Sequence, residues 1–203
     1  MKNLKTLGLA LALLLSTGAF KKDNPMLAIG AKAPMTNYEM EDISGSSYTL
    51  EGLKKDNGLL VIFSCNTCPF VLGWEDQYPG LKELSDKLSV GMVLVNSNEK
   101  KREGDDSMSE MQKHAKAAGY EMPYVIDANN KLADAFGART TPHVYLFDSD
   151  MKLVYRGSIN DKYENKSKEA KKEYLREALK ALAKGGEIPQ ADTREIGCSI
   201  KRV

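Results

Sequence analysis

Two cysteines separated by two residues carry the clearest sign of chemistry in the sequence. Cys65 and Cys68 enclose the dipeptide Asn66-Thr67. A thiolate attacks a disulfide through a mixed-disulfide intermediate, and a second thiol one helical turn away can then release the product. This spacing predicts a dithiol that exchanges disulfides.

The residues around this pair predict its place in the fold. Residues 58–63 form a continuous apolar run that is typical of a strand buried on both faces, and helix-capping residues follow it. Pro69 is favoured in the first turn of a helix. We therefore expect Cys65 at the amino end of a helix, where the helix dipole stabilises a thiolate, and Cys68 inside the helix and more deeply buried. Under this interpretation Cys65 attacks and Cys68 resolves.

A second segment could face the pair. Thr141-Pro142 stands just before the strand expected at 143–148, and a Pro can occupy the first position of a strand without breaking the ladder. A cis bond here would turn the Thr141 backbone outward, where it could pair with an extended substrate chain. We expect Thr141 and Pro142 to bind substrate. His143 is an accessory candidate that could tune Cys65 by its charge, although a solvent-bonded strand residue is the simpler interpretation.

Cys198 is the third cysteine, and an odd number leaves at least one thiol without an internal partner. It could be a third redox thiol that exchanges with the pair, a site for a disulfide with another protein, or a packed cysteine in a docked tail. The sequence leaves these three alternatives open.

The apolar pattern predicts one small α/β domain at residues 34–186, after a linker at 20–33 and before an irregular tail at 187–203. Strands alternate with helices along the chain, and a hairpin followed by a helix comes last. This order favours a central mixed sheet flanked by helices, with another hairpin as an extension at the N-terminus. The expected strands are 35–40, 47–50, 58–63, 91–96, 123–127, 143–148 and 151–156. The expected helices are 69–88 with a kink or a split at Pro79-Gly80, 105–118, 131–136 and 167–184.

Residues 1–19 have the three parts of a secretory signal peptide: a short basic region, a Leu/Ala-rich run and small residues at the end. They predict a periplasmic or secreted protein, and an oxidising compartment suits a disulfide chemistry. With 29 basic and 28 acidic residues the formal net charge is +1, so the charge gives no case for a nucleic-acid partner.

The strand, the motif Cys65-Asn66-Thr67-Cys68-Pro69, the helix and the later Thr141-Pro142 hairpin resemble the thioredoxin superfamily. The Gly30–Pro34 segment, the motif through Val71 and the Gly197–Lys201 tail resemble its redoxin branch, which holds peroxiredoxin-like and TlpA-like proteins. This resemblance implies a thioredoxin-like fold, a cis bond at Pro142, and a thiol–disulfide oxidoreductase that needs no cofactor. Its partners would be a disulfide or dithiol substrate and a membrane-linked thiol donor or acceptor.

Two alternatives remain. In a thiol peroxidase of this family Cys68 would be the peroxidatic residue, but the helper positions for Thr, Pro and Arg hold Cys65, Val61 and Pro142. A copper-binding relative would need a His near two cysteines, and His143 is the candidate. A zinc site lacks a second pair of ligands at a suitable spacing, and a structural disulfide within one turn would close almost no loop. We therefore expect no bound metal.

Overall fold

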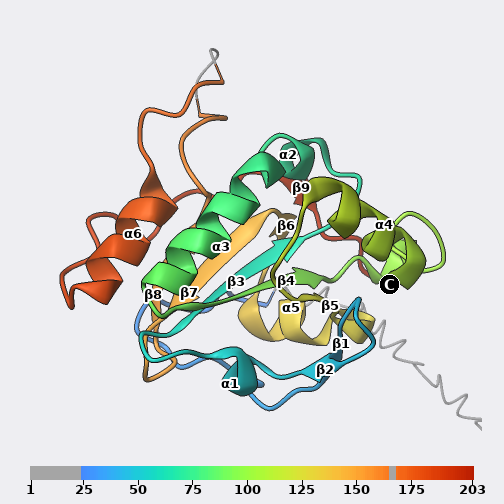
Figure 1. Cartoon of the computed structure of the whole chain (residues 1–203), viewed down its shortest axis with the longest axis horizontal. Helices are drawn as coiled ribbons and strands as arrows, with labels where there is room; N and C mark the ends of the chain where they lie inside the picture. Colours follow the sequence, from blue (N-terminus) through green and yellow to red (C-terminus); the bar gives the residue numbers. More distant parts are fainter. Residues whose placement is uncertain (1–23, 165–167) are drawn as a thin grey trace, which may run out of the picture.

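The computed structural model describes residues 24–164 and 168–203. Its centre is a five-stranded mixed sheet in the order β5-β4-β3-β7-β8 (Figure 1). The strands β3 and β4 are parallel, as are β4 and β5, whereas β7 pairs antiparallel with both β3 and β8. Their bounds are β3 Leu59–Ser64, β4 Gly91–Asn96, β5 Tyr124–Ile126, β7 His143–Phe147 and β8 Leu153–Gly157.

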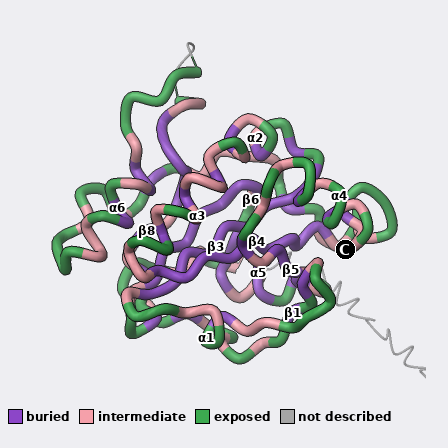
Figure 2. Tube along the Cα trace, in the orientation of Figure 1, coloured by how far each residue is buried: buried purple, intermediate pink, exposed green. Residues whose placement is uncertain are grey.

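The alternation of side chains in β3 explains why the sheet is buried on both faces. Leu60 and Ile62 belong to one apolar cluster, and Leu59, Val61 and Phe63 belong to the other. Every residue of β3 and of β4 is buried (Figure 2). Since successive strand residues point to opposite faces, a continuous apolar run is what a doubly covered strand requires.

Helices cover the two faces of the sheet. The first cluster receives residues of α3 (Tyr78–Lys87), α4 (Met108–Ala118) and α6 (Tyr174–Ala183), and the second receives residues of α1 (Leu50–Leu53) and α5 (Lys131–Phe136). Ser107 caps α4 by accepting a bond from the Glu110 N–H, and Gly119 ends α4 in the left-handed conformation. The predicted fold class, a mixed sheet flanked by helices, is confirmed.

The N-terminal hairpin is present but shorter than expected. It consists of β1 (Met40–Glu41) and β2 (Ser47–Tyr48), paired antiparallel. The expected strand at 35–40 therefore contributes only its last residue. The second strand stops early because the Thr49 side chain accepts a bond from the Gly52 N–H and caps α1.

Three predictions about helices and the tail were wrong. The helical segment expected at 69–88 is split, but before the position expected: α2 (Pro69–Leu72), a 3-10 turn η1 (Glu75–Gln77) and α3 follow one another, and Pro79 lies in the first turn of α3 instead of at the break. The last helix, α6, begins at Tyr174 and not at 167. The tail, expected to be irregular, contains a short strand, β9 (Cys198–Ser199), which pairs with β6 (Thr140–Thr141).

The predicted signal peptide at 1–19 lies outside the described residues. Residues 27–33, within the segment expected to be a linker, bond to the body of the fold: the Leu27 N–H donates to the Phe136 carbonyl and the Gly30 N–H to the Leu153 carbonyl. Among the described residues no helix is both long enough and apolar enough to span a membrane. The remaining short elements are the 3-10 turns η2 (Glu99–Lys101) and η3 (Ala128–Asn130).

Candidate functional site

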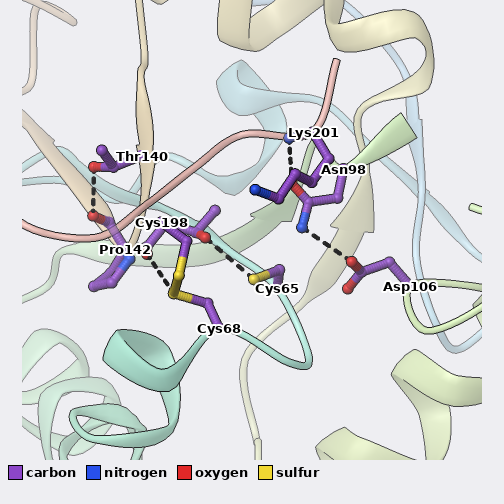
Figure 3. The surroundings of a disulfide bond; sticks show 9 residues. Cys65, Cys68, Asn98, Asp106, Thr140, Pro142, Cys198 and Lys201 are labelled. Atoms are coloured by element: carbon purple, nitrogen blue, oxygen red, sulfur yellow. Dashed lines mark hydrogen bonds between the residues drawn. A yellow bond between two sulfur atoms is a disulfide. The ribbon is translucent and has the colours of Figure 1, made fainter. Parts of the chain in front are cut away.

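The cysteine motif follows the end of β3, as predicted, and a disulfide joins its second cysteine to the tail. Cys68 is bonded to Cys198, 130 residues later, whereas Cys65 is free (Figure 3). Cys198 packs against the small cluster that contains Cys65, Cys68 and Val71. Of the three alternatives for Cys198, the structure therefore favours the first, a third redox thiol that forms a disulfide with the motif.

Cys65 does not lie at the amino end of a helix, contrary to the expectation. The helix α2 begins at Pro69, and Cys68 is its N-cap. Cys65 is only 2% exposed and Cys68 4%, so Cys68 is not the more buried residue. The reason is local: Cys65, Asn66 and Thr67 form a turn between β3 and α2, and the turn folds Cys65 inward.

Burial raises the pKa of the Cys65 thiol above its ordinary value, because a thiolate would lose its hydration there. The Thr141 hydroxyl and the backbone N–H groups of Cys68 and Thr67 lower this pKa, and the charge of Asp106 raises it. The net shift is upward. The predicted activation of Cys65 as a thiolate is therefore wrong for this state of the protein.

Thr141 contacts all three cysteines. Its hydroxyl lies 3.1 Å from Cys65 Sγ, and its carbonyl oxygen lies 3.1 Å from Cys68 Sγ. Its backbone stands opposite Cys198 in the β6–β9 pair. Thr141 is itself buried. One residue thus brings the motif and the tail into a single site.

The Thr141-Pro142 peptide bond is cis, as the resemblance implied. The backbone edge of Thr141, which we expected to pair with a substrate, is paired instead with residues of the same chain. Thr140 stands opposite Ser199 and Thr141 opposite Cys198, and the Ile200 N–H donates to the Arg139 carbonyl. The tail therefore occupies the edge that was assigned to a substrate.

The approach of the tail to Thr141 depends on a glycine. A Cβ at Gly197 would stand 2.3 Å from the Thr141 carbonyl oxygen and 2.7 Å from its carbonyl carbon. Both atoms are backbone and cannot move aside as a flexible side chain could. Two residues after Cys198, Ile200 is 5% exposed and belongs to the apolar cluster on the α5 side of the sheet.

A network of buried polar side chains hydrogen-bonds to the turn of the cysteine motif. Asp106 accepts bonds from the Asn66 N–H (2.9 Å), Asn96 Nδ2 (2.8 Å) and Asn98 Nδ2 (2.9 Å). Tyr124 donates its hydroxyl to Asn66 Oδ1 at 2.9 Å. These bonds fix the turn between Cys65 and Cys68, since Asn66 is held at both its backbone and its side chain.

This network was missed from the sequence. Asp106 was placed within a polar helix, whereas it is fully buried just before the N-cap of α4. Asn96 and Asn98 carried a usable signal: they are polar residues at the carboxyl end of a buried strand, the edge where sites form in such sheets.

His143 does not supply a charge to Cys65. It is fully buried in β7, and its Nδ1 accepts the Arg139 N–H at 3.3 Å. Burial, followed by the charges of Arg156 and Arg139, lowers the pKa of His143 to about 3, so the imidazole is neutral at physiological pH. The interpretation as a solvent-bonded residue is equally wrong.

An open polar pocket of about 740 Å³ lies beside the motif. Asn66 and Thr67 form one part of its wall, and residues of the loop before α4 and of α4 itself form the rest. A group of three or more His, Cys, Asp or Glu residues suited to a metal ion is not found in the described part of the chain.

The comparisons with known proteins agree with this fold. The AhpC/TSA family model matches residues 29–156, so the chain belongs to the AhpC/TSA family. A search of curated proteins returned no match. An uncharacterized conserved protein from Geobacillus kaustophilus is 35% identical, with a TM-score of 0.81 over 87% of this chain and 93% of its own.

Two more distant structures show the thioredoxin-like fold alone. The peroxidoxin BcpB from Mycobacterium tuberculosis is 16% identical, with a TM-score of 0.55 over 79% of this chain and 94% of its own. A putative protein disulfide isomerase from Bacteroides thetaiotaomicron is 16% identical, with a TM-score of 0.56 over 78% of this chain and 91% of its own. The chain is thus a redoxin, and its fold is shared by proteins named for peroxide and for disulfide chemistry.

Proposed function

We propose that this redoxin is a thiol–disulfide oxidoreductase. Cys68 forms a disulfide with each of three partners in turn: Cys198, Cys65 and a substrate. The observation that carries the proposal is the contact of Thr141 with all three cysteines. Three cysteines that hold one disulfide always leave a free thiol beside it, and thiol–disulfide exchange needs both groups in one place.

The exchange balances without a cofactor. A substrate thiolate attacks one sulfur of the Cys68–Cys198 bond, a mixed disulfide forms, and the other cysteine leaves as a thiolate. The second thiol of the substrate then attacks the mixed disulfide. The substrate leaves with a disulfide, and the protein gains two electrons and two thiols. The reverse sequence reduces a substrate disulfide, and the direction depends on the reduction potentials.

The geometry changes the roles of the two motif cysteines. The buried thiol of Cys65 has a raised pKa and is poorly suited to attack a substrate. Cys65 is instead the free thiol that packs in the same small cluster as the Cys68–Cys198 bond. We therefore assign Cys68 to exchange with substrates and Cys65 to resolve, the reverse of the order expected from the sequence.

We further propose that the protein works in the periplasm or outside the cell, with a membrane-linked thiol donor or acceptor that restores its redox state. The support for this location is the pattern of residues 1–19. Fractionation of cells that express the full chain, with mass measurement of the mature N-terminus, tests it. A protein that stays in the cytoplasm with residues 1–19 attached would contradict it.

Thiol peroxidase activity is the second candidate, and the Cys68–Cys198 disulfide favours it. A peroxide would oxidise the Cys68 thiolate to a sulfenic acid and leave as an alcohol or water. The Cys198 thiol would then condense with the sulfenic acid, giving the observed disulfide and water. Against this candidate, Cys65 stands where the helper Thr of a peroxidase would be. The hydroxyl that would hydrogen-bond to the peroxide oxygen in the transition state is therefore missing from that position.

The variant Cys65→Ser distinguishes the two functions. The reduced protein is mixed with hydrogen peroxide, and the loss of its thiols is followed over time. In a parallel assay dithiothreitol is the electron donor and insulin is the model disulfide substrate, and the precipitation of the reduced insulin chains is followed. We expect repeated turnover of insulin disulfides that falls in Cys65→Ser and stops in Cys68→Ser. Rapid second-order oxidation by peroxide that survives Cys65→Ser would overturn the oxidoreductase in favour of the peroxidase.

A further inference from the structure

The tail that carries Cys198 is held by many contacts that involve no sulfur. The Lys201 N–H donates to Asn98 Oδ1 at 2.8 Å, and the Lys100 N–H donates to the Lys201 carbonyl at 3.0 Å. Arg202 bonds to Asp134 at 2.8 Å, and Ile200 is buried. The tail therefore has anchors that persist when the Cys68–Cys198 bond opens.

Asn98 is the residue where the tail and the cysteine motif are joined. Its side-chain oxygen accepts the Lys201 N–H, and its side-chain nitrogen donates to Asp106 Oδ2. The other oxygen of Asp106 accepts the N–H of Asn66, the residue after Cys65. Figure 3 shows Asn98 between Lys201 and Asp106. A continuous line of hydrogen bonds thus runs from the motif to the tail, separate from the disulfide.

We propose that Asn98 is a positioning residue for Cys198, keeping its sulfur beside Cys68 while the disulfide moves between cysteines. The amide is 4% exposed and both of its ends are hydrogen-bonded, so its removal leaves the Lys201 N–H and Asp106 Oδ2 without this partner. An open tail would let Cys198 diffuse away, whereas a docked tail keeps its effective concentration high.

The step that this positioning serves is an exchange within the chain. The Cys65 thiol loses its proton and its sulfur attacks Cys68. The Cys65–Cys68 bond forms as the Cys68–Cys198 bond breaks, and Cys198 leaves as a thiolate that takes up one proton. The number of electrons is unchanged, so no outside oxidant is needed. The inference rests on the proposed function, because it gives Cys198 a place in the same exchange.

The ratio of the two disulfides measures the positioning. The full chain is equilibrated in a glutathione buffer that leaves one disulfide per molecule, quenched in acid, and mapped by mass spectrometry. We expect Cys68–Cys198 to exceed Cys65–Cys68 in the wild type. Asn98→Ala removes two side-chain hydrogen bonds, of which one is to the tail, and should shift the ratio toward Cys65–Cys68 by about threefold to tenfold, the worth of that one bond.

Two controls separate positioning from general stability. Asn57→Ala removes a side-chain bond of similar length, to the Leu88 carbonyl, at the opposite end of β3 from the motif, and should leave the ratio unchanged. Lys201→Pro deletes the N–H that Asn98 accepts, while Lys201→Ala keeps that N–H and removes only an exposed side chain. Lys201→Pro should shift the ratio as Asn98→Ala does. Because Lys201 is itself exposed and Asn98 keeps its side chain, this variant also serves if Asn98→Ala does not fold.

A swap of the two side chains provides the rescue. In the double variant Asn98→Asp with Asp106→Asn, the new amide accepts from Asn66 and Asn96 and donates to the new carboxylate, which accepts the Lys201 N–H. Every bond and the total charge are kept, so the ratio should return toward the wild type, whereas Asn98→Asp alone places two carboxylates together and should not.

The outcomes distinguish this inference from the proposed function. A wild-type protein that forms neither disulfide would overturn both. A wild type that forms both disulfides, with a ratio unchanged in Asn98→Ala and Lys201→Pro, would overturn only the role of Asn98. If the disulfide ratio of the double variant is no closer to the wild-type ratio than that of Asn98→Asp alone, the role of Asn98 is overturned as well.

Discussion

Thr141 stands directly opposite Cys198 in the β6–β9 pair, while its hydroxyl contacts the sulfur of Cys65. The residue before Pro142 therefore contacts a cysteine of the motif with its side chain and holds a cysteine of the tail with its backbone. In this protein the backbone edge at Thr141, which could pair with a substrate strand, pairs with the tail of the same chain. The tail is therefore part of the site.

Replacement of Thr141 by Val should make Cys65 less reactive. The hydroxyl lowers the pKa of the Cys65 thiol against the dominant effect of burial, so its loss raises that pKa further and leaves less thiolate at a given pH. With the Cys68–Cys198 bond intact, Cys65 is the one free thiol of the three. The measurement is the pH profile of its alkylation by iodoacetamide.

Thr141→Ser keeps the hydroxyl and is the control. Its profile should lie with the wild type, and that of Thr141→Val should move to higher pH. A Val variant whose Cys65 is alkylated at lower pH than in the wild type would show that the hydroxyl does not stabilise the thiolate.

Gly197→Ala should weaken the docking of the tail. The new Cβ would lie 2.3 Å from the Thr141 carbonyl oxygen, and relief of such an overlap in a packed region costs about 1–3 kcal/mol. We expect a lower melting temperature and less of the Cys68–Cys198 bond at equilibrium. Gly186→Ala, where the nearest atom to a Cβ is 3.6 Å away, is the matched control and should change neither. Equal behaviour of the two variants would contradict the close approach.

Cys198→Ser should lower the stability of the oxidised protein. The Cys68–Cys198 bond closes a loop of 130 residues, and loss of a native disulfide costs about 2–5 kcal/mol, mainly because the unfolded chain gains freedom. Urea unfolding of the oxidised proteins measures the difference. After reduction the wild type and the variant should unfold at similar urea concentrations, and a difference of the same size in the reduced state would contradict the explanation.

His143→Phe should protect the protein against acid. The folded pKa of His143, about 3, lies below its ordinary value of 6.5, so the stability from the neutral imidazole is complete above pH 6.5. It is lost as the pH falls toward 3, because the unfolded chain binds a proton that the folded one excludes. The loss has an upper limit of roughly 5 kcal/mol.

The measurement is the free energy of unfolding as a function of pH. The wild type should lose stability between pH 6.5 and 3 more steeply than His143→Phe. Parallel curves for the wild type and His143→Phe would contradict a neutral, buried His143.

The sheet was predictable because its signals are local. Residues 91–96 read as a buried strand and form β4 at the same bounds, and residues 131–136 form α5 as expected. Runs of apolar residues and capping residues report on neighbours in the chain. The fold class therefore followed from the sequence, and so did the place of Cys65 after a strand.

The chemistry of the site was harder to predict because it depends on distant residues. The sequence places Cys65 near capping residues and Pro69 in the first helical turn, but only the folded chain shows that Cys68 is the N-cap and that Asp106 and Thr141 surround the Cys65 thiol. The pairing of Cys198 with Cys68 joins residues 130 positions apart, and with three cysteines several pairings were open.

The most direct test of the central claim, that Cys68 is the sulfur shared by every disulfide of the site, is a redox titration with disulfide mapping. The full chain is equilibrated across a series of glutathione potentials, and its bonds are identified at each point. We predict Cys68–Cys198 and Cys65–Cys68 in changing proportion, and no internal disulfide in Cys68→Ser. A Cys65–Cys198 bond as the main oxidised form, or disulfide exchange with a substrate that continues in Cys68→Ser, would contradict the claim.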